Sequence, residues 1–352
     1  MEKIKIGITC GDINSISLEV ILKSLSKEMI LDHIIPVLYG NIKIVSYHKN
    51  IVNLENLSLY VLNPGEKPKA GRINVVNVWQ DQVTLNLGKP SVEGGKYALM
   101  ALDAALEDFK NQQIDALVTG PIHKYSMKLA GFEYKGHTDY LSAKMGSKNQ
   151  LMMMVSDKLK MGLVCDHVPL KEVSGLITKE RVLKCIQIME QSLIKDFGYE
   201  KPAIAVLGLN PHAGEEGILG SEEEDFIRPA IIESKKNGVF VSGPYAADGF
   251  FGSGHFSKFH GILAMYHDQG LIPFKTLNFS EGVNYTAGLP IIRTSPDHGT
   301  AFDLAGKNES DFRSMFHAIL MARNIVATRK GYHEMRQNPL KKKPKLSEES
   351  SE

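Results

Sequence analysis

The apolar residues of this chain form short runs that alternate with longer stretches of helical spacing. Residues 4–9 alternate lysine with β-branched residues before a Gly-Asp turn, which predicts a strand. Residues 17–25 place leucine and isoleucine three or four positions apart, which predicts a helix. Further strands are predicted at 34–40, 114–119, 163–165, 203–209 and 261–265, and further helices at 93–109, 179–195 and 222–237.

Strands that alternate with helices in this way predict an α/β fold with a largely parallel, buried sheet. In such sheets ligands bind beyond the carboxyl ends of the strands. Polar and glycine-rich segments follow several predicted strands, at 120–121, 166–167, 210–212 and 267–268. The sequence therefore predicts a binding site at this edge, and it contains no internal repeat.

The bulk composition indicates a globular protein of two lobes or domains. The chain has 352 residues, and its net charge of +1 gives no electrostatic reason to expect nucleic acid or a membrane as partner. Three widely spaced cysteines argue against disulfides and favour a reducing compartment. Because no apolar run suits a signal peptide or a membrane span, we expect a cytoplasmic protein.

Residues 331–352 have a different composition. They carry a lysine run at 341–345 and then acidic and serine residues, and we expect them to be a disordered tail. Binding of nucleic acid through the lysines is the weaker alternative.

Three histidines each follow an apolar, strand-like run: His167, His212 and His267. In a parallel sheet they would share one edge, where three neutral imidazoles can bind a divalent ion and leave positions open for substrate. Asp166 and Asp268 lie next to two of them and could orient the rings. From their spacing alone, these could equally be ordinary histidines at strand ends.

A second set of side chains suits a phosphate or carboxylate group. It consists of His137, Thr138, Lys275, Asn284 and Arg293. The alternative is that the cations lie on the surface. Arg293 ends an apolar run, however, and a buried arginine there needs an anionic partner.

The sequence has neither the usual dinucleotide-binding glycine motif nor a P-loop. The loop at 297–307, DHGTAFDLAGK, could cradle an adenosine through backbone groups. The residues alone identify it only as a polar loop before a helix.

Five ordered segments carry a resemblance to a known family. They are ALVTGPIHK at 116–124, GHTDYL at 136–141, GLNPHAGEEGILGSEE at 208–223, AMYHDQGLIPFK at 264–275 and GVNYTAGLPIIRTSPDHGTAFDLAGK at 282–307. From about residue 3 to about 328 the chain resembles the 4-hydroxythreonine-4-phosphate dehydrogenases of vitamin B6 biosynthesis.

The resemblance implies a two-lobed fold like that of isocitrate and isopropylmalate dehydrogenases rather than the usual Rossmann fold. We expect residues 1–125 with 297–330 to form the first lobe and 126–296 the second, which carries metal, substrate and dimer contacts. The resemblance also implies a homodimer whose active site draws on both subunits, with His267 supplied by the partner.

The implied reaction is oxidation of the substrate C3 hydroxyl by NAD, with NADP as an alternative, followed by loss of CO2 to give 3-amino-2-oxopropyl phosphate. One divalent ion (Zn, Mg, Co or Mn) would be held by the three histidines, and the anion-binding set would contact the substrate and its phosphate. The implied cofactor contacts are His298, Gly299, Thr300, Asp303 and Gly306. The candidates for proton transfer are Asp248, Asp268 and Lys275.

The chain departs from the family pattern after the first strand. Ser15 and Ser17 stand where the family motif GDPAGIGPE has glycines, and a serine at a position of positive φ would be strained. Ala287 replaces a usual leucine, which we expect to affect packing rather than chemistry.

Two other functions remain open from the sequence. One is a related NAD- and metal-dependent dehydrogenase of another phosphorylated hydroxy acid, such as a four-carbon sugar-acid phosphate. The other is a non-redox enzyme or phosphometabolite-binding protein on the same scaffold, which NAD binding would distinguish.

Overall fold

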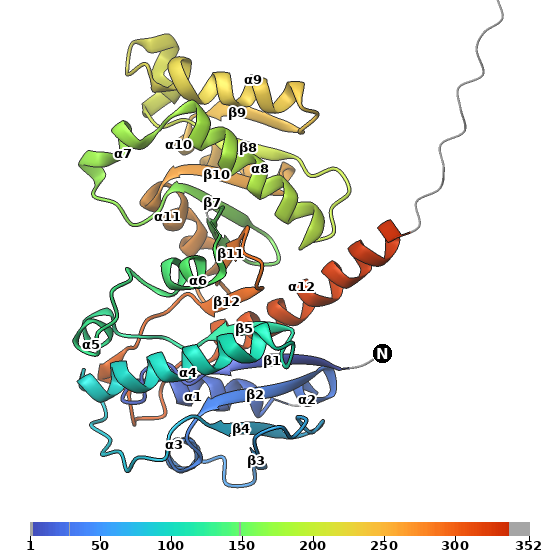
Figure 1. Cartoon of the computed structure of the whole chain (residues 1–352). Helices are drawn as coiled ribbons and strands as arrows, with labels where there is room; N and C mark the ends of the chain where they lie inside the picture. The colour runs from blue at the N-terminus through green and yellow to red at the C-terminus, as the bar shows by residue number, and fades with distance from the viewer. Residues whose placement is uncertain (1–2, 28, 148, 338–352) are drawn as a thin grey trace, which may run out of the picture.

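The computed structural model describes residues 3–27, 29–147 and 149–337, and it is built on one twelve-stranded sheet (Figure 1). The strand order is β3-β4-β2-β1-β5-β12-β11-β6-β7-β10-β8-β9. All neighbouring strands in it are parallel except the pairs β12–β11, β11–β6 and β6–β7. The α/β fold with a largely parallel sheet is therefore confirmed.

The strands are β1 (Ile4–Thr9), β2 (Ile34–Gly40), β3 (Leu59–Leu62), β4 (Ile73–Asn77), β5 (Ala116–Thr119), β6 (Leu151–Val155), β7 (Lys160–Cys165), β8 (Ile204–Leu207), β9 (Val241–Tyr245), β10 (Gly261–Tyr266), β11 (Val283–Ala287) and β12 (Arg293–Pro296). The α-helices are α1 (Ser17–Leu25), α2 (Ile30–His33), α3 (Ile42–Ile51), α4 (Val92–Lys110), α5 (Lys124–Leu129), α6 (His137–Met145), α7 (Leu170–Leu176), α8 (Lys179–Lys195), α9 (Arg228–Lys236), α10 (Ala247–Gly252), α11 (His267–Asn278) and α12 (Arg313–Gln337). Shorter helical turns are η1 (Pro211–Gly217), η2 (Glu223–Ile227), η3 (His255–Lys258) and η4 (Phe302–Leu304).

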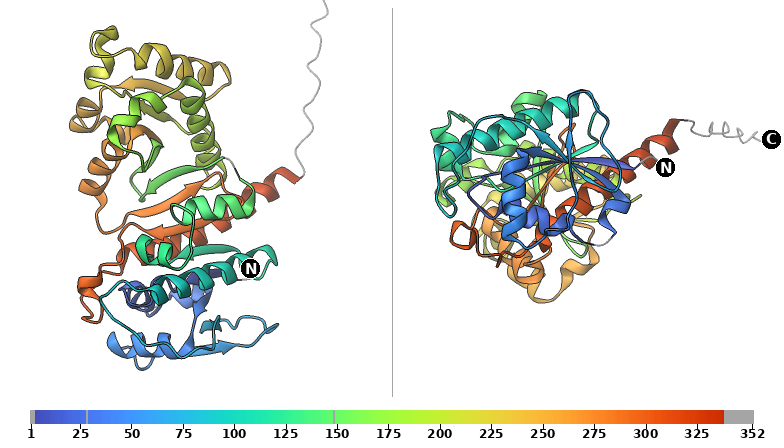
Figure 2. Two further views of the ribbon diagram at one scale, coloured as in Figure 1. Left: turned by 60° about the vertical axis from the view of Figure 1, so that its left-hand side comes forward. Right: turned by 90° about the horizontal axis from the view of Figure 1, so that it is seen from below.

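Helices pack on both faces of the sheet, as the view from below shows (Figure 2). Helices α4 and α12 both contact β1 and β5, whereas α8 and α11 both contact β7 and β10. The central strands are buried on both sides for this reason, and Ile6 and Ile8 of β1 have no exposed surface. The proposed division into lobes at 125/126 and 296/297 stays a prediction. The two segments share one continuous sheet, in which β5 of the first segment pairs with β12 of the second.

The predicted helices at 17–25 and 179–195 are confirmed as α1 and α8, and the segment 222–237 divides into the π-helical turn η2 and α9. The pattern missed β3, β4, β6, β9, β11 and β12. Strands β11 and β12 were missed because they read VNYTA and RTSP, which contain polar side chains instead of a hydrophobic run.

The expectation of disorder from residue 331 is wrong for its first seven residues. Helix α12 continues to Gln337, and the guanidinium of Arg336 lies 3.7 Å from the ring centroid of Tyr332, one turn earlier. Residues 338–352, with the lysine run, lie outside the described residues. Within residues 3–337, apart from 28 and 148, none of the helices is both long and apolar enough to cross a bilayer.

The unusual serines after β1 are accommodated without backbone strain. Neither Ser15 nor Ser17 has a positive φ, whereas Gly11 does, at 64°. The Ser15 hydroxyl donates to the carbonyl of Asp12 at 2.7 Å and accepts from the amide of Ser17 at 3.1 Å. Asn14 ties this turn to a neighbouring loop, because its Oδ1 accepts from the amide of Asn86 at 2.8 Å. Ala287 is buried in β11 opposite Leu151, a packing position as expected.

A buried ionic network fixes α12 to the rest of the fold. Asp196, at the end of α8, is 4 % exposed and pairs with Arg329 of α12. Its second oxygen accepts from Ser192 at 2.7 Å and from the hydroxyl of Tyr285 on β11. Because Ser192, Asp196 and Tyr285 are buried and the side chain of Arg329 is only 13 % exposed, each depends largely on the others for its hydrogen bonds.

We predict that Asp196→Asn lowers the free energy of unfolding by about 3–5 kcal/mol, because it leaves the guanidinium of Arg329 buried without a counter-charge. Urea denaturation measures this effect. Glu233→Gln is the control, since its pair with Lys179 is exposed and should contribute no more than about 1 kcal/mol. Equal losses in the two variants would contradict the assignment.

Asp12 is a second buried carboxylate, and it lies in the turn after β1. It is 1 % exposed; its Oδ1 accepts from the amide of Asn14 at 2.9 Å, while Oδ2 has no hydrogen-bond partner among the described residues. Burial raises the pKa of Asp12 to about 6. A carboxyl whose pKa is higher in the folded state contributes stability below its ordinary pKa, and that contribution is lost as pH rises through about 6.

We predict that Asp12→Asn stabilises the protein at about pH 8 but much less at about pH 5, because the amide never ionises. The expected difference between the two pH values is on the order of 2 kcal/mol. Thermal unfolding of both proteins at the two pH values measures it. A gain independent of pH would show that the carboxylate is not destabilised by burial.

Candidate active site

The sheet brings the three singled-out histidines to one edge. Strands β7, β10 and β8 are neighbours and parallel, so their carboxyl ends lie together. His167 follows β7, His267 begins α11 directly after β10, and His212 lies in the turn η1 after β8. This arrangement matches the one that the strand order predicts.

Two of the three rings lie close together. The ring centroids of His167 and His267 are 5.6 Å apart. Asp268 lies 2.7 Å from Nδ1 of His267 and can orient its ring, whereas Asp166 uses its Oδ1 to accept from the backbone amide of His167. Loss of solvent is the main cause that lowers the pKa of His167, so its neutral form is favoured.

His212 lies apart from this pair, on a turn with left-handed backbone. Residues 212–216 all have positive φ, beginning with 51° at His212. Buried Glu223 supports the turn, because its Oε1 accepts from the amides of Leu209 and Asn210 at 2.7 and 2.8 Å. No three His, Cys, Asp or Glu side chains among the described residues are grouped so that they could hold a metal ion. A single chain thus brings together two of the three expected ligands.

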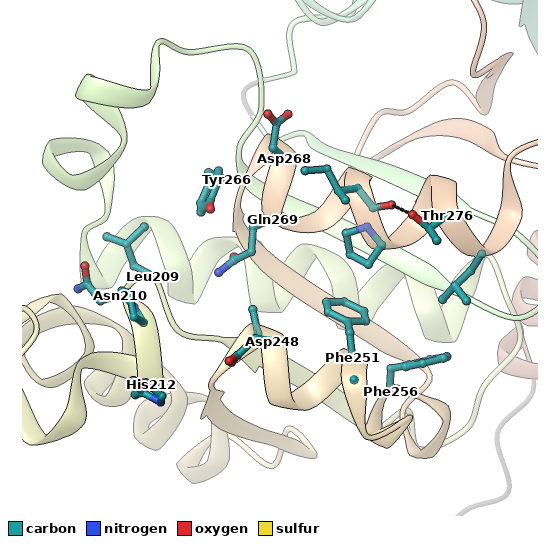
Figure 3. Close-up of a pocket in the computed structure, with 16 residues that line it drawn as sticks. Leu209, Asn210, His212, Asp248, Phe251, Phe256, Tyr266, Asp268, Gln269 and Thr276 are labelled. Carbon is teal, nitrogen blue, oxygen red and sulfur yellow. Dashed lines mark hydrogen bonds between the residues drawn. The ribbon is translucent and has the colours of Figure 1, made fainter.

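His212 instead lines a cavity of about 740 Å³ between η1, α10 and α11. Figure 3 shows His212 and Asp248 at one side of the cavity and Asp268 at the other. Much of its wall is apolar, with Phe251 and Ile272 among the lining residues. Two of the candidate acids, Asp248 and Asp268, therefore line the same cavity as a candidate metal ligand, with Asp268 at its rim (Figure 3).

Arg293 is the centre of the candidate anion site. It is the first residue of β12 and is only 4 % exposed. Its Nε and one terminal nitrogen donate to the hydroxyl of Thr119 on β5, at 3.1 and 2.7 Å, and the same terminal nitrogen lies 3.4 Å from Nδ1 of His137. Within the described chain no carboxylate pairs with Arg293, and burial lowers its pKa to about 10, so it stays charged. Such a buried cation needs an anion.

His137 and Thr138 begin helix α6, whose amino end carries a partial positive charge. Desolvation, with Arg293 as a second cause, lowers the pKa of His137 well below its ordinary value. A neutral ring that accepts from Arg293 at Nδ1 keeps its proton on Nε2, where it can donate to an anion. The hydroxyls of Thr138 and Thr286 are 3.4 Å apart.

Asn284 and Lys275 reach the region from β11 and α11. The side-chain oxygen of Asn284 is buried without a hydrogen-bond partner among the described residues. Lys275 forms an ion pair with Asp297 at 3.1 Å, so its charge is already compensated. Burial raises the pKa of Asp297, whereas nearby Lys275, His298 and His267 lower it. Asp297 thus connects the substrate set with the cofactor loop.

Sequence reasoning missed Thr119 and Asp297. Thr119 ends a predicted strand and Asp297 begins the polar loop at 297–307, so both belong to segments that were singled out. Their partners are 174 residues away in the first case and 22 in the second, which no local pattern reveals.

The predicted cofactor loop packs against the turn after β1. The amide of Ile16 donates to the carbonyl of Thr300 at 3.2 Å, and the amide of Gly306 donates to the carboxylate of Glu19 at 2.7 Å. Gly299 borders open space, and Asp303 is exposed. Four buried polar atoms here have no partner among the described residues: Oδ2 of Asp12, Oγ of Ser17, Oε2 of Glu19 and Nε2 of His298. This supply of unsatisfied groups suits a polar ligand.

Comparison with known proteins points to one family. The family model for "Pyridoxal phosphate biosynthetic protein PdxA" matches residues 32–322. A 4-hydroxythreonine-4-phosphate dehydrogenase from Bacteroides thetaiotaomicron is 44 % identical over 341 residues, which cover 97 % of this chain and 93 % of the relative. A relative from Oceanobacillus iheyensis, whose assigned name is D-threonate 4-phosphate dehydrogenase, is 38 % identical over 328 residues and covers 92 % of this chain and 98 % of its own.

The fold is also similar to that of a solved structure. The crystal structure of 4-hydroxythreonine-4-phosphate dehydrogenase from Klebsiella pneumoniae superimposes with a TM-score of 0.79 at 32 % identity, and the match covers 92 % of this chain and all of that one. The resemblance inferred from the five sequence segments is thereby confirmed. The chain belongs to the PdxA family of pyridoxal phosphate biosynthetic proteins.

Proposed function

We propose that this protein oxidises 4-phosphohydroxy-L-threonine with NAD and releases CO2 to form 3-amino-2-oxopropyl phosphate, in the cytoplasmic synthesis of pyridoxal phosphate. The observation that carries the proposal is the buried guanidinium of Arg293, which has no carboxylate partner in the described chain. A phosphate monoester supplies the missing charge and can accept several hydrogen bonds at once. The names of the relatives support the same substrate.

The binding set would hold the phosphate from two elements, β12 and the amino end of α6. Arg293 supplies the charge, Thr119 holds the guanidinium in place, and His137 and Thr138 present donors at the amino end of α6. Fixing the phosphate in this way positions the C3 hydroxyl for hydride transfer, which lowers the entropic part of the barrier. The unsatisfied amide oxygen of Asn284 suits a donor such as the substrate amino group.

The residues for a divalent metal fit in part. His167 and His267 lie together, and His212 is the third expected ligand but lies elsewhere in the single chain. The resemblance implies that the partner supplies His267, but here His267 lies beside His167 of the same chain, so a second copy that completes this pair would supply its His212 instead. A bound metal would polarise the substrate hydroxyl and stabilise the charge that develops during decarboxylation.

The proposed homodimer would use the exposed apolar face of α11. Ile272 and Leu277 are 64 and 50 % exposed, and Phe279 directly after the helix is 80 % exposed. Such a patch beside the cavity of His212 is typical of a protein interface. An interface here would also place the metal-ligand candidates of the two copies close to one another.

The cofactor residues fit a dinucleotide. The loop with His298, Gly299 and Thr300 borders open space and is fixed to the turn after β1. The unsatisfied oxygen of Glu19 and nitrogen of His298 would bind ribose hydroxyls or adenine edges. We propose NAD as the cofactor, with NADP as the alternative.

Proton transfer would fall to acids that line the site. Asp268 holds His267 and lines the same cavity as Asp248 and His212, which favours an orienting role for Asp268 and leaves Asp248 as the freer proton acceptor. Lys275 is paired with Asp297 and could return a proton to the enolate after CO2 leaves.

One alternative substrate has specific support. The Oceanobacillus iheyensis relative carries D-threonate 4-phosphate in its name. The same phosphate site would serve that compound, which lacks the amino group. A non-redox role remains the alternative from another class.

We predict that purified protein forms NADH from 4-phosphohydroxy-L-threonine and NAD when a divalent metal is present, and that EDTA abolishes the reaction. Absorbance of NADH follows the turnover, and D-threonate 4-phosphate is assayed in parallel. Turnover of only the second compound would replace the substrate but retain the chemistry. A folded dimer that oxidises neither compound would refute the dehydrogenase proposal.

We predict that Arg293→Met raises the KM for the phosphorylated substrate about 10- to 100-fold, because charged hydrogen bonds of about 1.5–3 kcal/mol are lost. Steady-state kinetics with saturating NAD measures the change. The control Arg228→Met removes an exposed arginine that pairs with Glu224, and it should leave KM unchanged. If the two variants behave alike, Arg293 does not bind the phosphate.

A further inference from the structure

A second buried cation lies at the other end of the sheet from the candidate active site. Lys160 is the first residue of β7, opposite Val155 of β6, and is 7 % exposed. His167 follows the opposite end of the same strand, roughly 20 Å away at about 3.3 Å per residue. Nothing in the proposed reaction uses Lys160.

The ammonium group of Lys160 has aromatic but no ionic neighbours in the described chain. It lies 5.4 Å from the ring centroids of both Phe197 and Tyr199. Asp196 is near but is not available, because Arg329, Ser192 and Tyr285 engage its two oxygens. Contacts with ring faces offset part of the desolvation of an ammonium, but aromatic rings offer its N–H donors no oxygen acceptor.

This side chain faces a cavity of about 410 Å³ with three walls. The turn between β6 and β7 forms one, the segment after α8 forms the second, and one face of α12 forms the third. The residues from α12 are His317, Leu320, Met321, Asn324, Ile325 and Thr328. Their spacing of three and four places them on a single side of the helix, which gives the cavity a mixed wall with three apolar and three polar side chains.

We propose that this cavity binds a small organic anion, whose carboxylate or phosphate group pairs with Lys160 and whose apolar part lies against Leu320, Met321 and Ile325. The volume of the cavity falls in the range of small-molecule sites, and its lining combines one buried cation with both polar and apolar side chains, which suits a small anion with an apolar part. The other acidic group of the wall, Asp157, is exposed in the turn, where water screens its charge.

Fluorine NMR with para-fluorobenzoate tests the proposal on the full-length protein. We expect saturable binding at millimolar probe, and we expect Lys160→Met to weaken it about tenfold or more. Lys160→Arg should retain binding, and so should Lys158→Met, a matched control in the same turn. If phenyl phosphate displaces the probe, the site accepts phosphate esters. If phenyl phosphate does not displace it, the site is one for carboxylates.

Thermal unfolding accompanies each titration. Lys160→Met should unfold at the wild-type temperature or above it, because an apolar side chain of similar length replaces an uncompensated buried charge. If that variant does not fold, probe binding is measured with Lys160→Gln instead. The proposal is overturned if the wild-type protein binds no probe, or if Lys160→Met binds it with wild-type affinity and stoichiometry, which would place the probe at Arg293.

Discussion

The charge of Arg293 is the constraint on which the centre of this structure depends. Its guanidinium is buried in the middle of a twelve-stranded sheet, where an uncompensated charge is costly, and it stays protonated because its pKa falls only to about 10. The surrounding groups do not neutralise it. A threonine hydroxyl and a neutral histidine only hold it in place, so the fold maintains a position that an anionic ligand completes.

The burial and polarity of each strand explain which strands could be predicted from the sequence. The central parallel strands are buried on both faces, so their apolar pattern predicted β1, β2, β5, β7, β8 and β10 and the edge at which the histidines lie. The outer parallel strands β3, β4 and β9 are only partly buried and lack this pattern. Strands β11 and β12 carry the polar side chains of the anion site and therefore did not read as strands. Each residue type in the site was predictable, but the contact between Arg293 and Thr119 depends on the pairing of β12 with β5, which no local pattern contains.

The metal site, too, could be predicted only in part from the sequence. Strand order predicts that His167, His212 and His267 share an edge, and they do, yet only two of the rings lie together in one chain. The left-handed turn at 212–216 sets the direction of His212, and its geometry follows from hydrogen bonds to Glu223 rather than from residue spacing. The apolar surface of α11 beside that turn is the reason to expect that a second chain completes the site.

The most direct test of the central claim is the thermal stability of the protein in inorganic phosphate. A ligand that binds only the folded state raises the unfolding temperature, and the rise grows with the logarithm of ligand concentration above the dissociation constant. The account predicts that increasing phosphate, at constant ionic strength, raises the unfolding temperature of the wild-type protein and has much less effect on Arg293→Met. An equal rise in both proteins would mean that Arg293 is not the anion site, and the assignment of the phosphorylated substrate to this position would fail.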